Sequence, residues 1–397
     1  MNMSTLPNWM TPQGIADLAK MHGTPLYVYA RDALKVQART ALSMQAPFGL
    51  TVRYAMKANP HPDILKLFKN EGLHIDASSG YEAEKALQSG FEPSQILITA
   101  QQLPDNLKEL VARGVQFTAT SLHQLEVYCQ LFPGEDVSVR INPAMGDGMN
   151  NRLTTGGVNA SFGIWHEYIP EVKKIAADSG SKITRLHTHI GTGTNPAKWE
   201  EAEAISLDLV KQFPDVTTLD LGGGFKVAYM ESEPSADMNE IGERLAKKLQ
   251  QFAEQTGRKL HLEIEPGKFL VAGAGILLAE VIDTSDTGKD GHVFLRTNTG
   301  MNDLLRPGIY GAQHPLITVK KDGSLPPENE EVVVVGHNCE STDVLTPYPG
   351  DPERLKPRLM GKAEIGDYIA IGMTGAYGAS MATHGYNSYP SAKEILI

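Results

Sequence analysis

The sequence predicts an α/β protein with a second, all-β part, on three observations. Short apolar runs alternate with segments of helical period between about residues 33 and 270. About eight such strand–helix units fit into this stretch, which is the number that a closed (β/α)8 TIM barrel requires. Beyond residue 270 strand-like runs follow one another with turn-rich loops between them. We therefore expect an N-terminal segment at 1–32, a barrel at 33–270 and a β domain at 271–397.

The elements follow in order from the hydrophobic pattern. The N-terminal segment contains a helix at 11–21, started by Thr-Pro, and a strand at 25–30. The apolar runs that predict barrel strands are 52–55, 73–77, 96–100, 116–119, 137–141, 185–190, 218–221 and 260–264. Helical periods between them include 81–88, 107–113, 122–131 and 200–212. An open doubly wound sheet is the alternative arrangement, and the number of units favours the barrel.

The β domain is predicted from a change of pattern. Strand-like runs occur at 277–282, 293–298, 332–335 and 367–372. The segment 321–331 is rich in charge and proline, so we expect an exposed connection there.

Composition limits the functional classes. A length of 397 residues, 41% of them apolar, predicts a globular protein of about two domains. The net charge of −11 argues against nucleic acid and anionic membranes as partners. Two cysteines provide no disulfide framework, and we find neither a signal peptide nor an apolar run of roughly 18 residues. We expect a cytoplasmic enzyme that binds neither membrane nor nucleic acid.

Lys57 is the first candidate site residue. It follows the apolar run 52–55 and precedes the turn signal Asn59-Pro60, so it lies where a strand ends. An amine in a desolvating pocket becomes a nucleophile towards carbonyl groups, including the aldehyde of pyridoxal phosphate. A surface lysine at a strand end is the simpler alternative.

Other strand ends supply groups that would suit the same cofactor, because barrel active sites form at the carboxyl ends of the strands. Gly222–Gly224 could turn backbone N–H groups towards a phosphate, although tight turns explain glycines equally well. Glu265 could hold a pyridine nitrogen protonated, or be a salt-bridged carboxylate. His189 could lie on a ring face, or be a satisfied core group. Asp76 could orient Lys57 or the ring hydroxyl, or cap a helix.

No metal site is expected. The sequence contains no HExxH, no pair of CxxC motifs, no Walker loop and no spaced GxGxxG.

Several motifs, in this order, resemble the fold-type III pyridoxal-phosphate decarboxylases, and most of all the diaminopimelate decarboxylases. They are YAMKANP, HTHIGTG, LDLGGGF, EIEPGKFLV, GMNDLLRPGIYGAQHP, GHNCESTDVL and TGAYGASM, and the similarity extends over about 25–390. The resemblance implies an alanine-racemase-like barrel followed by a C-terminal β-barrel domain. It also implies pyridoxal 5'-phosphate as cofactor and a homodimer whose active sites lie at the subunit interface.

The resemblance assigns roles residue by residue. Lys57 matches the Schiff-base lysine, His189 the residue stacked on the ring and Glu265 the partner of the pyridine nitrogen. Cofactor contacts are further expected from Asp76, Thr192, Gly222, Gly223, Gly224, Pro266, Gly267, Lys268 and Tyr377.

The substrate residues come from the same resemblance. Arg306 and Tyr310 match residues that hold a substrate carboxylate, and Cys339 matches the proton donor. Glu340 matches the contact to the far amino group, while Lys268 and Tyr377 are also expected to touch substrate. A buried, inert thiol is the alternative for Cys339, and it is the role we assign to Cys129.

The implied activity is decarboxylation of meso-2,6-diaminopimelate to L-lysine and CO2. Alternatives are a decarboxylase of this fold that acts on ornithine, arginine, carboxynorspermidine or a siderophore intermediate, a non-catalytic cofactor carrier, or an inactive structural paralogue. The Cys339-Glu340 pair favours a diamino diacid. Among the departures from the usual pattern, Lys268 stands where arginine usually follows EPG, and 383–390 is one residue longer, with Tyr389 where arginine is common.

Overall fold

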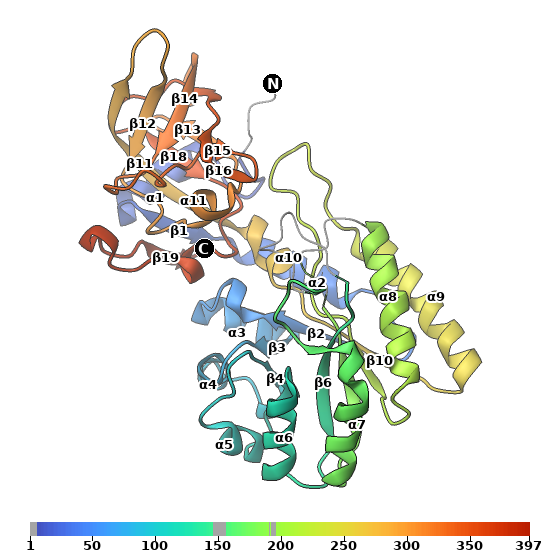
Figure 1. The fold of residues 1–397 in the computed structure, drawn as a ribbon. Coiled ribbons are helices and arrows are strands. Elements are labelled where there is room, and N and C mark those ends of the chain that lie inside the picture. The colour runs from blue at the N-terminus through green and yellow to red at the C-terminus, as the bar shows by residue number, and fades with distance from the viewer. Residues whose placement is uncertain (1–5, 146–155, 190, 192–195) are drawn as a thin grey trace. The chain divides into compact units, whose positions relative to one another are not determined.

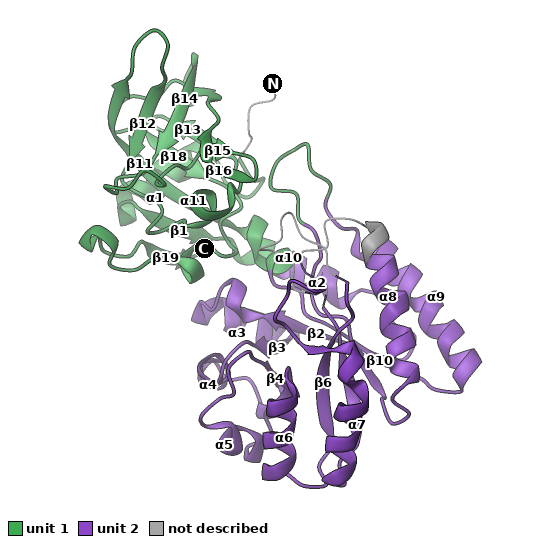
Figure 2. Cartoon of the chain, viewed as in Figure 1, with its two compact units in different colours: residues 1–34, 227–234, 268–397 green, residues 35–226, 235–267 purple. Residues whose placement is uncertain are grey.

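The structure is a computed structural model that describes residues 6–145, 156–189, 191 and 196–397. The chain forms two compact units (Figure 2). Unit 1 comprises residues 1–34, 227–234 and 268–397, and unit 2 comprises 35–226 and 235–267. The domain boundaries that we expected after residues 32 and 270 stay predictions.

Unit 2 is the predicted barrel, which is confirmed. Its strands pair in the order β5-β4-β3-β2-β10-β9-β8-β6, all in parallel, and β5 also pairs with β6, so that the ring closes. A short strand, β7 (Ile164–Trp165), adds to β6. The ring strands are β2 (Leu50–Ala55), β3 (His74–Ala77), β4 (Ile96–Thr99), β5 (Gln116–Ala119), β6 (Val137–Asn142), β8 (Ile183–His187), β9 (Thr218–Asp220) and β10 (His261–Ile264).

Helices connect the barrel strands and cover the outside of the ring (Figure 1). They are α3 (Pro62–Glu71), α4 (Gly80–Gln88), α5 (Leu107–Ala112), α6 (Leu122–Leu131), α7 (Ile169–Asp178), α8 (Pro196–Lys211) and α9 (Met238–Thr256), while α2 (Arg31–Leu42) begins in unit 1 and continues into unit 2.

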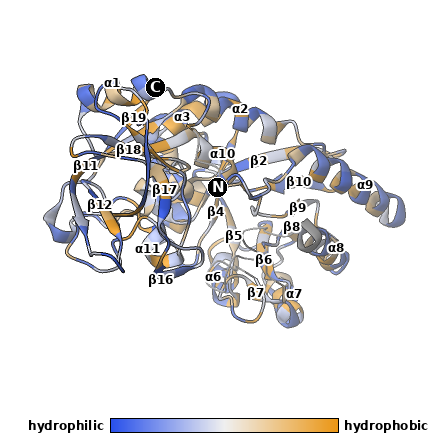
Figure 3. Ribbon diagram, turned by 90° about the horizontal axis from the view of Figure 1, so that it is seen from above, coloured by the Kyte–Doolittle hydropathy of each residue, from blue (hydrophilic) through white to orange (hydrophobic). Residues whose placement is uncertain are grey.

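Helix α9 shows why such a segment is helical. The Asp237 side chain accepts hydrogen bonds from the N–H groups of Asn239 and Glu240, and Gly257 ends the helix with a φ of 71°. Apolar residues at helical spacing, including Leu245 and Leu249, are buried on one face. The alternation of hydrophilic and hydrophobic residues along α9 can be followed in Figure 3.

A layer of charged side chains fills part of the barrel interior. Arg53 on β2 and Glu263 on β10 form an ion pair of 2.8 Å, and both side chains are buried. Arg185 on β8 pairs with the same carboxylate at 3.0 Å, and Gln116 accepts hydrogen bonds from both arginines. Because buried charges are costly unless paired, this layer is stable only as a complete set.

Unit 1 is built on a mostly antiparallel sheet of eight strands, with β13 and β17 at the ends of its main path. The strands are β1 (Leu26–Tyr29), β11 (Gly275–Asp286), β12 (Val293–Thr297), β13 (Leu316–Val319), β14 (Asn329–Val335), β17 (Arg358–Gly361), β18 (Tyr368–Ile371) and β19 (Lys393–Leu396). Smaller elements are the hairpin β15 (Pro347–Tyr348) and β16 (Asp351–Leu355), and the helices α1 (Pro12–His22), α10 (Lys268–Val271) and α11 (Arg306–Tyr310).

The N-terminal segment belongs to this sheet. Strand β1 pairs antiparallel with β11 and parallel with β19, and α1 contributes Ile15, Ala16 and Ala19 to the core that Leu278 and Tyr368 also line.

The predicted elements agree with the structure except at some ends. We predicted a strand at 185–190, but β8 ends at His187, and Ile190 lies outside the described residues. The predicted connection at 321–331 is shorter, because β14 already begins at Asn329. None of the described helices combines the length and the apolar composition that crossing a membrane requires.

Candidate active site

Lys57 lies in a single 3-10 turn, η1 (Met56–Ala58), at the carboxyl end of β2. Met56 and Ala58 are buried, whereas the Lys57 side chain is exposed. The Tyr54 hydroxyl donates to the Asn59 carbonyl oxygen at 2.8 Å and so fixes the turn. The lysine is therefore at the rim, as we expected, but among the described residues its side chain is exposed and not enclosed by the desolvating pocket that we expected.

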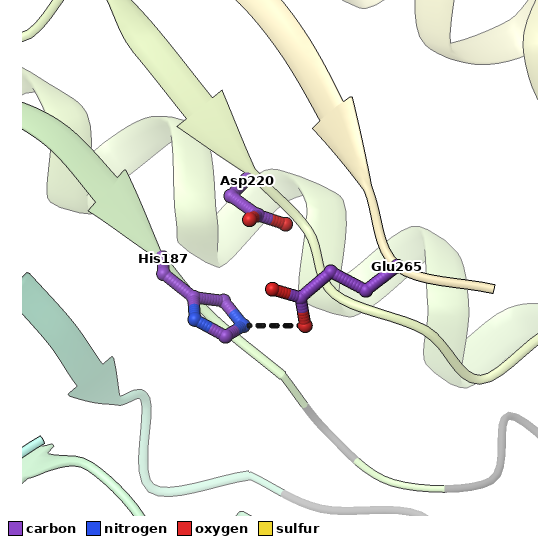
Figure 4. A group of neighbouring side chains, drawn as sticks. All are labelled: His187, Asp220 and Glu265. Carbon is purple, nitrogen blue, oxygen red and sulfur yellow. Dashed lines mark ion pairs between the residues drawn. The ribbon is translucent and has the colours of Figure 1, made fainter. Parts of the chain in front are cut away.

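Three buried side chains meet at the carboxyl ends of β8, β9 and β10 (Figure 4). They are His187, Asp220 and Glu265, and one ligand atom from each lies within 4.8 Å of those of the other two. His187 Nε2 is 3.4 Å from Glu265 Oε2. The carboxyl groups of Asp220 and Glu265 are close enough that each affects the pKa of the other.

Burial and like charge decide which groups in this cluster are charged. Burial, together with the nearby carboxylates of Asp220 and Asp76, raises the pKa of Glu265 well above its usual range. Burial and the charge of Glu263 raise the pKa of Asp220 to about 7. The site therefore keeps a proton on Glu265 in neutral solution.

Both histidines of the HTHIGTG motif are neutral. Burial lowers the pKa of His187 and of His189 well below the usual range, and Arg140 lowers both further. His189 Nδ1 accepts a hydrogen bond of 3.1 Å from the Gly223 N–H, so its other ring nitrogen carries the proton.

Asp76 is buried on β3 and does not cap a helix. Ser79 is the N-cap of α4, accepting from the Glu82 N–H at 3.1 Å. Burial raises the pKa of Asp76, and the positive charges of Lys57 and Arg140 oppose that shift. Asp76 is thus a core carboxyl group in the electrostatic field of Lys57.

The glycine run after β9 is held in place from two sides. Gly222 has a φ of 66° and donates its N–H to Asp220 at 2.8 Å. A Cβ atom on Gly222 would lie 2.6 Å from His189 Nδ1, so only glycine fits. The indole N–H of Trp199 donates to the Gly224 carbonyl oxygen at 3.2 Å. We expected these glycines to offer N–H groups to a phosphate, but Asp220 and His189 already accept those of Gly222 and Gly223.

Pro266 and Gly267 close the rim next to Lys57. The Pro266 carbonyl oxygen accepts from the Ala55 N–H at 3.3 Å. A Cβ atom on Gly267 would lie 3.2 Å from Ala55 Cβ, so the absence of a side chain allows this close packing.

In unit 1, Arg306 is the buried first residue of α11. Its guanidinium carbon lies 4.7 Å from the centre of the Tyr229 ring, and its Nη1 is 3.4 Å from His314 Nε2. Burial lowers the pKa of His314 to about 3, so the imidazole ring next to Arg306 is neutral. Tyr310, four residues on, is partly buried.

The Cys339-Glu340 pair lies in the loop after β14 and is exposed. The Cys339 N–H donates to the Asn387 side chain at 2.8 Å, and the Tyr386 hydroxyl donates to Glu340 Oε2 at 3.2 Å. Cys129 is buried, as we expected of a structural thiol.

The structure thus distributes the predicted site residues over the two units. The barrel unit brings together Lys57, Asp76, His189, Gly222, Gly223, Gly224, Glu265, Pro266 and Gly267. Unit 1 contains Lys268, Arg306, Tyr310, Cys339, Glu340 and Tyr377, the last with a φ of 56°. Thr192 lies outside the described residues.

Four further residues were missed. Arg140 is buried on β6 and interacts with Glu265, Asp76 and Asp220. Strand alternation could have shown it, because Ser138 and Arg140 interrupt an apolar run on one side. Asp220 could have been noted as the last residue of a strand before the glycine run. Tyr229 and His314 gave no signal, since their importance arises only from contact with Arg306.

Known proteins resemble the chain over almost its whole length. The family model for the pyridoxal binding domain of pyridoxal-dependent decarboxylases matches residues 34–272. Diaminopimelate decarboxylase of Streptomyces coelicolor is 34% identical over 402 residues, covering 99% of this chain and 88% of that protein. The chain belongs to the diaminopimelate decarboxylase family.

Solved structures of this family agree with that assignment. One crystal structure of a diaminopimelate decarboxylase is 32% identical, with a TM-score of 0.90, and covers 98% of this chain and 91% of its own. The Helicobacter pylori diaminopimelate decarboxylase complexed with L-lysine is 27% identical, with a TM-score of 0.82, and covers 96% of this chain and 93% of its own.

Pyridoxal phosphate, the cofactor of this family, fits the barrel residues. Glu265 Oε1 and Asp76 Oδ1 are buried without a hydrogen-bond partner among the described residues, so each can accept or share a proton with a ligand. Gly223 packs closely on the strand end that carries Glu265, because a Cβ there would lie 2.7 Å from the Glu265 carbonyl oxygen. An amine, a protonated carboxyl group and a neutral imidazole are the chemistry that a pyridine aldehyde needs.

Proposed function

We propose that the protein removes CO2 from meso-2,6-diaminopimelate and releases L-lysine, with pyridoxal phosphate as cofactor. The observation that carries this proposal is that Lys57 and Glu265 lie on one barrel rim, where the positive charge of Lys57 opposes the upward pKa shift of Glu265.

The barrel residues have distinct tasks in this proposal. When bound, the cofactor supplies an aldehyde that condenses with amines and a pyridine ring that takes up the electron pair left when CO2 departs. Lys57 would hold it covalently, and Glu265 holds a proton at its carboxyl group that it can share with a ring nitrogen. His189 presents a neutral imidazole, fixed by the Gly223 N–H, against which a flat ring can pack.

Unit 1 supplies the groups that suit the substrate. Arg306 presents a planar guanidinium, held by the Tyr229 ring, to which a carboxylate can bind through two parallel hydrogen bonds. The N–H of Thr342 and the hydroxyl of Tyr386 lower the pKa of Glu340, so it is negatively charged and suits an ammonium group. Cys339 offers a thiol proton to the carbon that has lost CO2.

We propose further that two copies of the chain form the active enzyme, each completing the other's site. Lys57, Cys339 and Glu340 are all exposed in the single chain. An exposed lysine and an exposed thiol are open to water and to other solutes. A second subunit that covers both would exclude water from them. Cys339 and Glu340 of one chain would then face the barrel site of the other.

The second candidate is a decarboxylase of the same fold with another basic amino acid as substrate. The observation that keeps it open is Lys268, which stands where arginine is usual. A lysine keeps the charge but loses the two-pronged geometry that favours a second carboxylate.

The test is CO2 release by the purified protein with added cofactor. The substrates are meso-diaminopimelate, L-lysine, ornithine and arginine, and Lys57→Ala is the control. The proposal expects release from meso-diaminopimelate above all, with L-lysine as product. Release from ornithine or arginine alone would favour the second candidate, and no release from any would contradict both.

A further inference from the structure

The loop that carries Cys339 and Glu340 is anchored firmly at its base. This loop, residues 336–343, follows β14. The Asp343 carboxylate accepts hydrogen bonds from the N–H groups of Met301 at 2.6 Å and Asn338 at 2.8 Å, and from the Asn338 side chain at 2.8 Å. Asp343 is buried, so these bonds are shielded from water. These bonds therefore fix the base of the loop in one conformation.

The tip of the loop is held instead by a segment near the C-terminus, residues 386–389. Asn387 accepts from the Cys339 N–H at 2.8 Å, and Tyr386 donates to Glu340 at 3.2 Å. Asn387 has a φ of 48°, which asparagine tolerates better than most residues. Tyr389 stacks on His337 with 3.7 Å between the ring centres and keeps the segment against the loop.

The Glu340 carboxylate is thereby held at both oxygens. Oε1 accepts from the Ser341 hydroxyl and the Thr342 N–H, each at 3.3 Å. Oε2 accepts from Tyr386. The bonds to Oε1 come from the loop itself, so Tyr386 is the contact from outside the loop that sets the direction of Oε2. An exposed glutamate without this contact would sample several rotamers.

We propose that Tyr386 is a specificity-determining residue, which orients Glu340 so that the site selects substrates with an ammonium group at the far end. This inference rests on the proposed function, which gives Glu340 the far amino group. A preoriented carboxylate loses less rotamer freedom on binding. The affinity therefore increases only for ligands that contact Glu340. Ligands that lack the far ammonium group gain nothing from Tyr386.

The experiment compares two ligands on the holoenzyme. L-Lysine carries an amino group at both ends, whereas 6-aminohexanoate has the same length without the α-amino group. Their dissociation constants are measured by calorimetry for the wild type and for Tyr386→Phe, which removes only the hydroxyl. We expect L-lysine to bind about fivefold to tenfold more weakly to the variant and 6-aminohexanoate to change less than about twofold, because a hydrogen bond to a charged group is lost for one ligand only. For meso-diaminopimelate, KM should rise by a similar factor with kcat nearly unchanged.

Two controls make the result specific. Tyr389→Phe removes a hydroxyl from the same segment that donates to the His337 carbonyl oxygen at 3.3 Å, and it should leave both dissociation constants within about twofold. In a Glu340→Gln background, Tyr386→Phe should add no further loss for L-lysine.

The outcomes separate the two proposals. Equal weakening of both ligands, no weakening of either, or a further loss in the Glu340→Gln background would overturn the role of Tyr386 while wild-type activity stands. A wild type that neither binds L-lysine nor releases CO2 from meso-diaminopimelate would overturn the proposed function, and this inference with it.

Discussion

Glu265 and His187 face each other across the barrel interior, with 3.4 Å between Glu265 Oε2 and His187 Nε2 and neither side chain open to solvent. The pair is not an ordinary salt bridge. The pKa of the histidine is lowered well below, and that of the glutamate raised well above, their usual ranges. Both groups are therefore neutral, and the charge of the site depends on Asp220 beside them.

Asp220 should make the stability of the cofactor-free protein depend on pH. Its pKa in the fold is about 7, above the usual 3.8, so the native state binds a proton that the unfolded state releases. The resulting stabilisation is complete below about pH 4 and is lost as the pH rises through about 7. Asp220→Asn keeps an acceptor for the Gly222 N–H but cannot ionise beside Glu263 and Glu265.

The measurement is thermal unfolding of both proteins at pH 5 and pH 8. The difference in melting temperature, Asp220→Asn minus wild type, should be larger at pH 8 than at pH 5 by about 3 °C or more. The same substitution at an exposed position, Asp105→Asn, is measured in parallel as control. A constant difference for Asp220→Asn would show that Asp220 is ionised in the fold.

Breaking the Arg53–Glu263 pair should be costly. Only 2% and 3% of these side chains are exposed, so Arg53→Met leaves a buried carboxylate with Arg185 as its remaining cation. We expect a loss of about 3–5 kcal/mol in the free energy of unfolding, measured by denaturant titration.

The double variant Arg53→Met/Glu263→Met removes both charges and should recover about half of that loss. Arg113→Ala, which breaks the half-exposed pair with Glu84, should cost less than about 1 kcal/mol. A similar cost for Arg113→Ala and Arg53→Met would mean that burial of the pair is unimportant.

Much of the fold was predictable because the barrel strands carry their own signal. The run at 137–141 is short and apolar at alternate residues, and it forms the buried strand β6. Strands β16 and β17 could not be found in this way. Asp351–Leu355 is charged and mostly exposed, and Arg358–Gly361 has only four residues, so both become strands because β15 and β14 pair with them.

The candidate site was predictable where a residue stands at a strand end. Lys57 and Glu265 each follow an apolar run, so their place on the rim could be read from the sequence. The role of Asn387 could not, because it contacts Cys339 from 48 residues away along the chain. The exposure of Lys57 was also unpredictable, since it depends on the turn η1 and not on the apolar neighbours.

Gly223→Ala should weaken cofactor binding. The added Cβ would meet the Glu265 carbonyl oxygen at 2.7 Å, and a backbone atom cannot move aside as a side chain can. We expect the dissociation constant for pyridoxal phosphate, measured by absorbance titration, to rise about tenfold or more. Gly273→Ala is the control, since its Cβ would meet only the flexible Met373 sulfur at 3.7 Å. Equal effects of both substitutions would contradict the role of the glycine run.

Cys339→Ala should slow CO2 release by about 100-fold or more while the cofactor stays bound, because a positioned proton donor contributes at least that factor. Turnover and cofactor absorbance are measured together. Cys129→Ala removes a buried thiol that has no part in the proposed chemistry and should keep normal turnover. Unchanged turnover of Cys339→Ala would remove this thiol from the reaction.

The attachment of the cofactor to Lys57 is tested most directly by borohydride reduction of the holoenzyme, followed by digestion and mass spectrometry. The account predicts the mass of a reduced pyridoxyl phosphate group on the peptide that contains Lys57, and its absence from Lys57→Arg treated in the same way. The added mass on another lysine, or on no peptide at all, would contradict it.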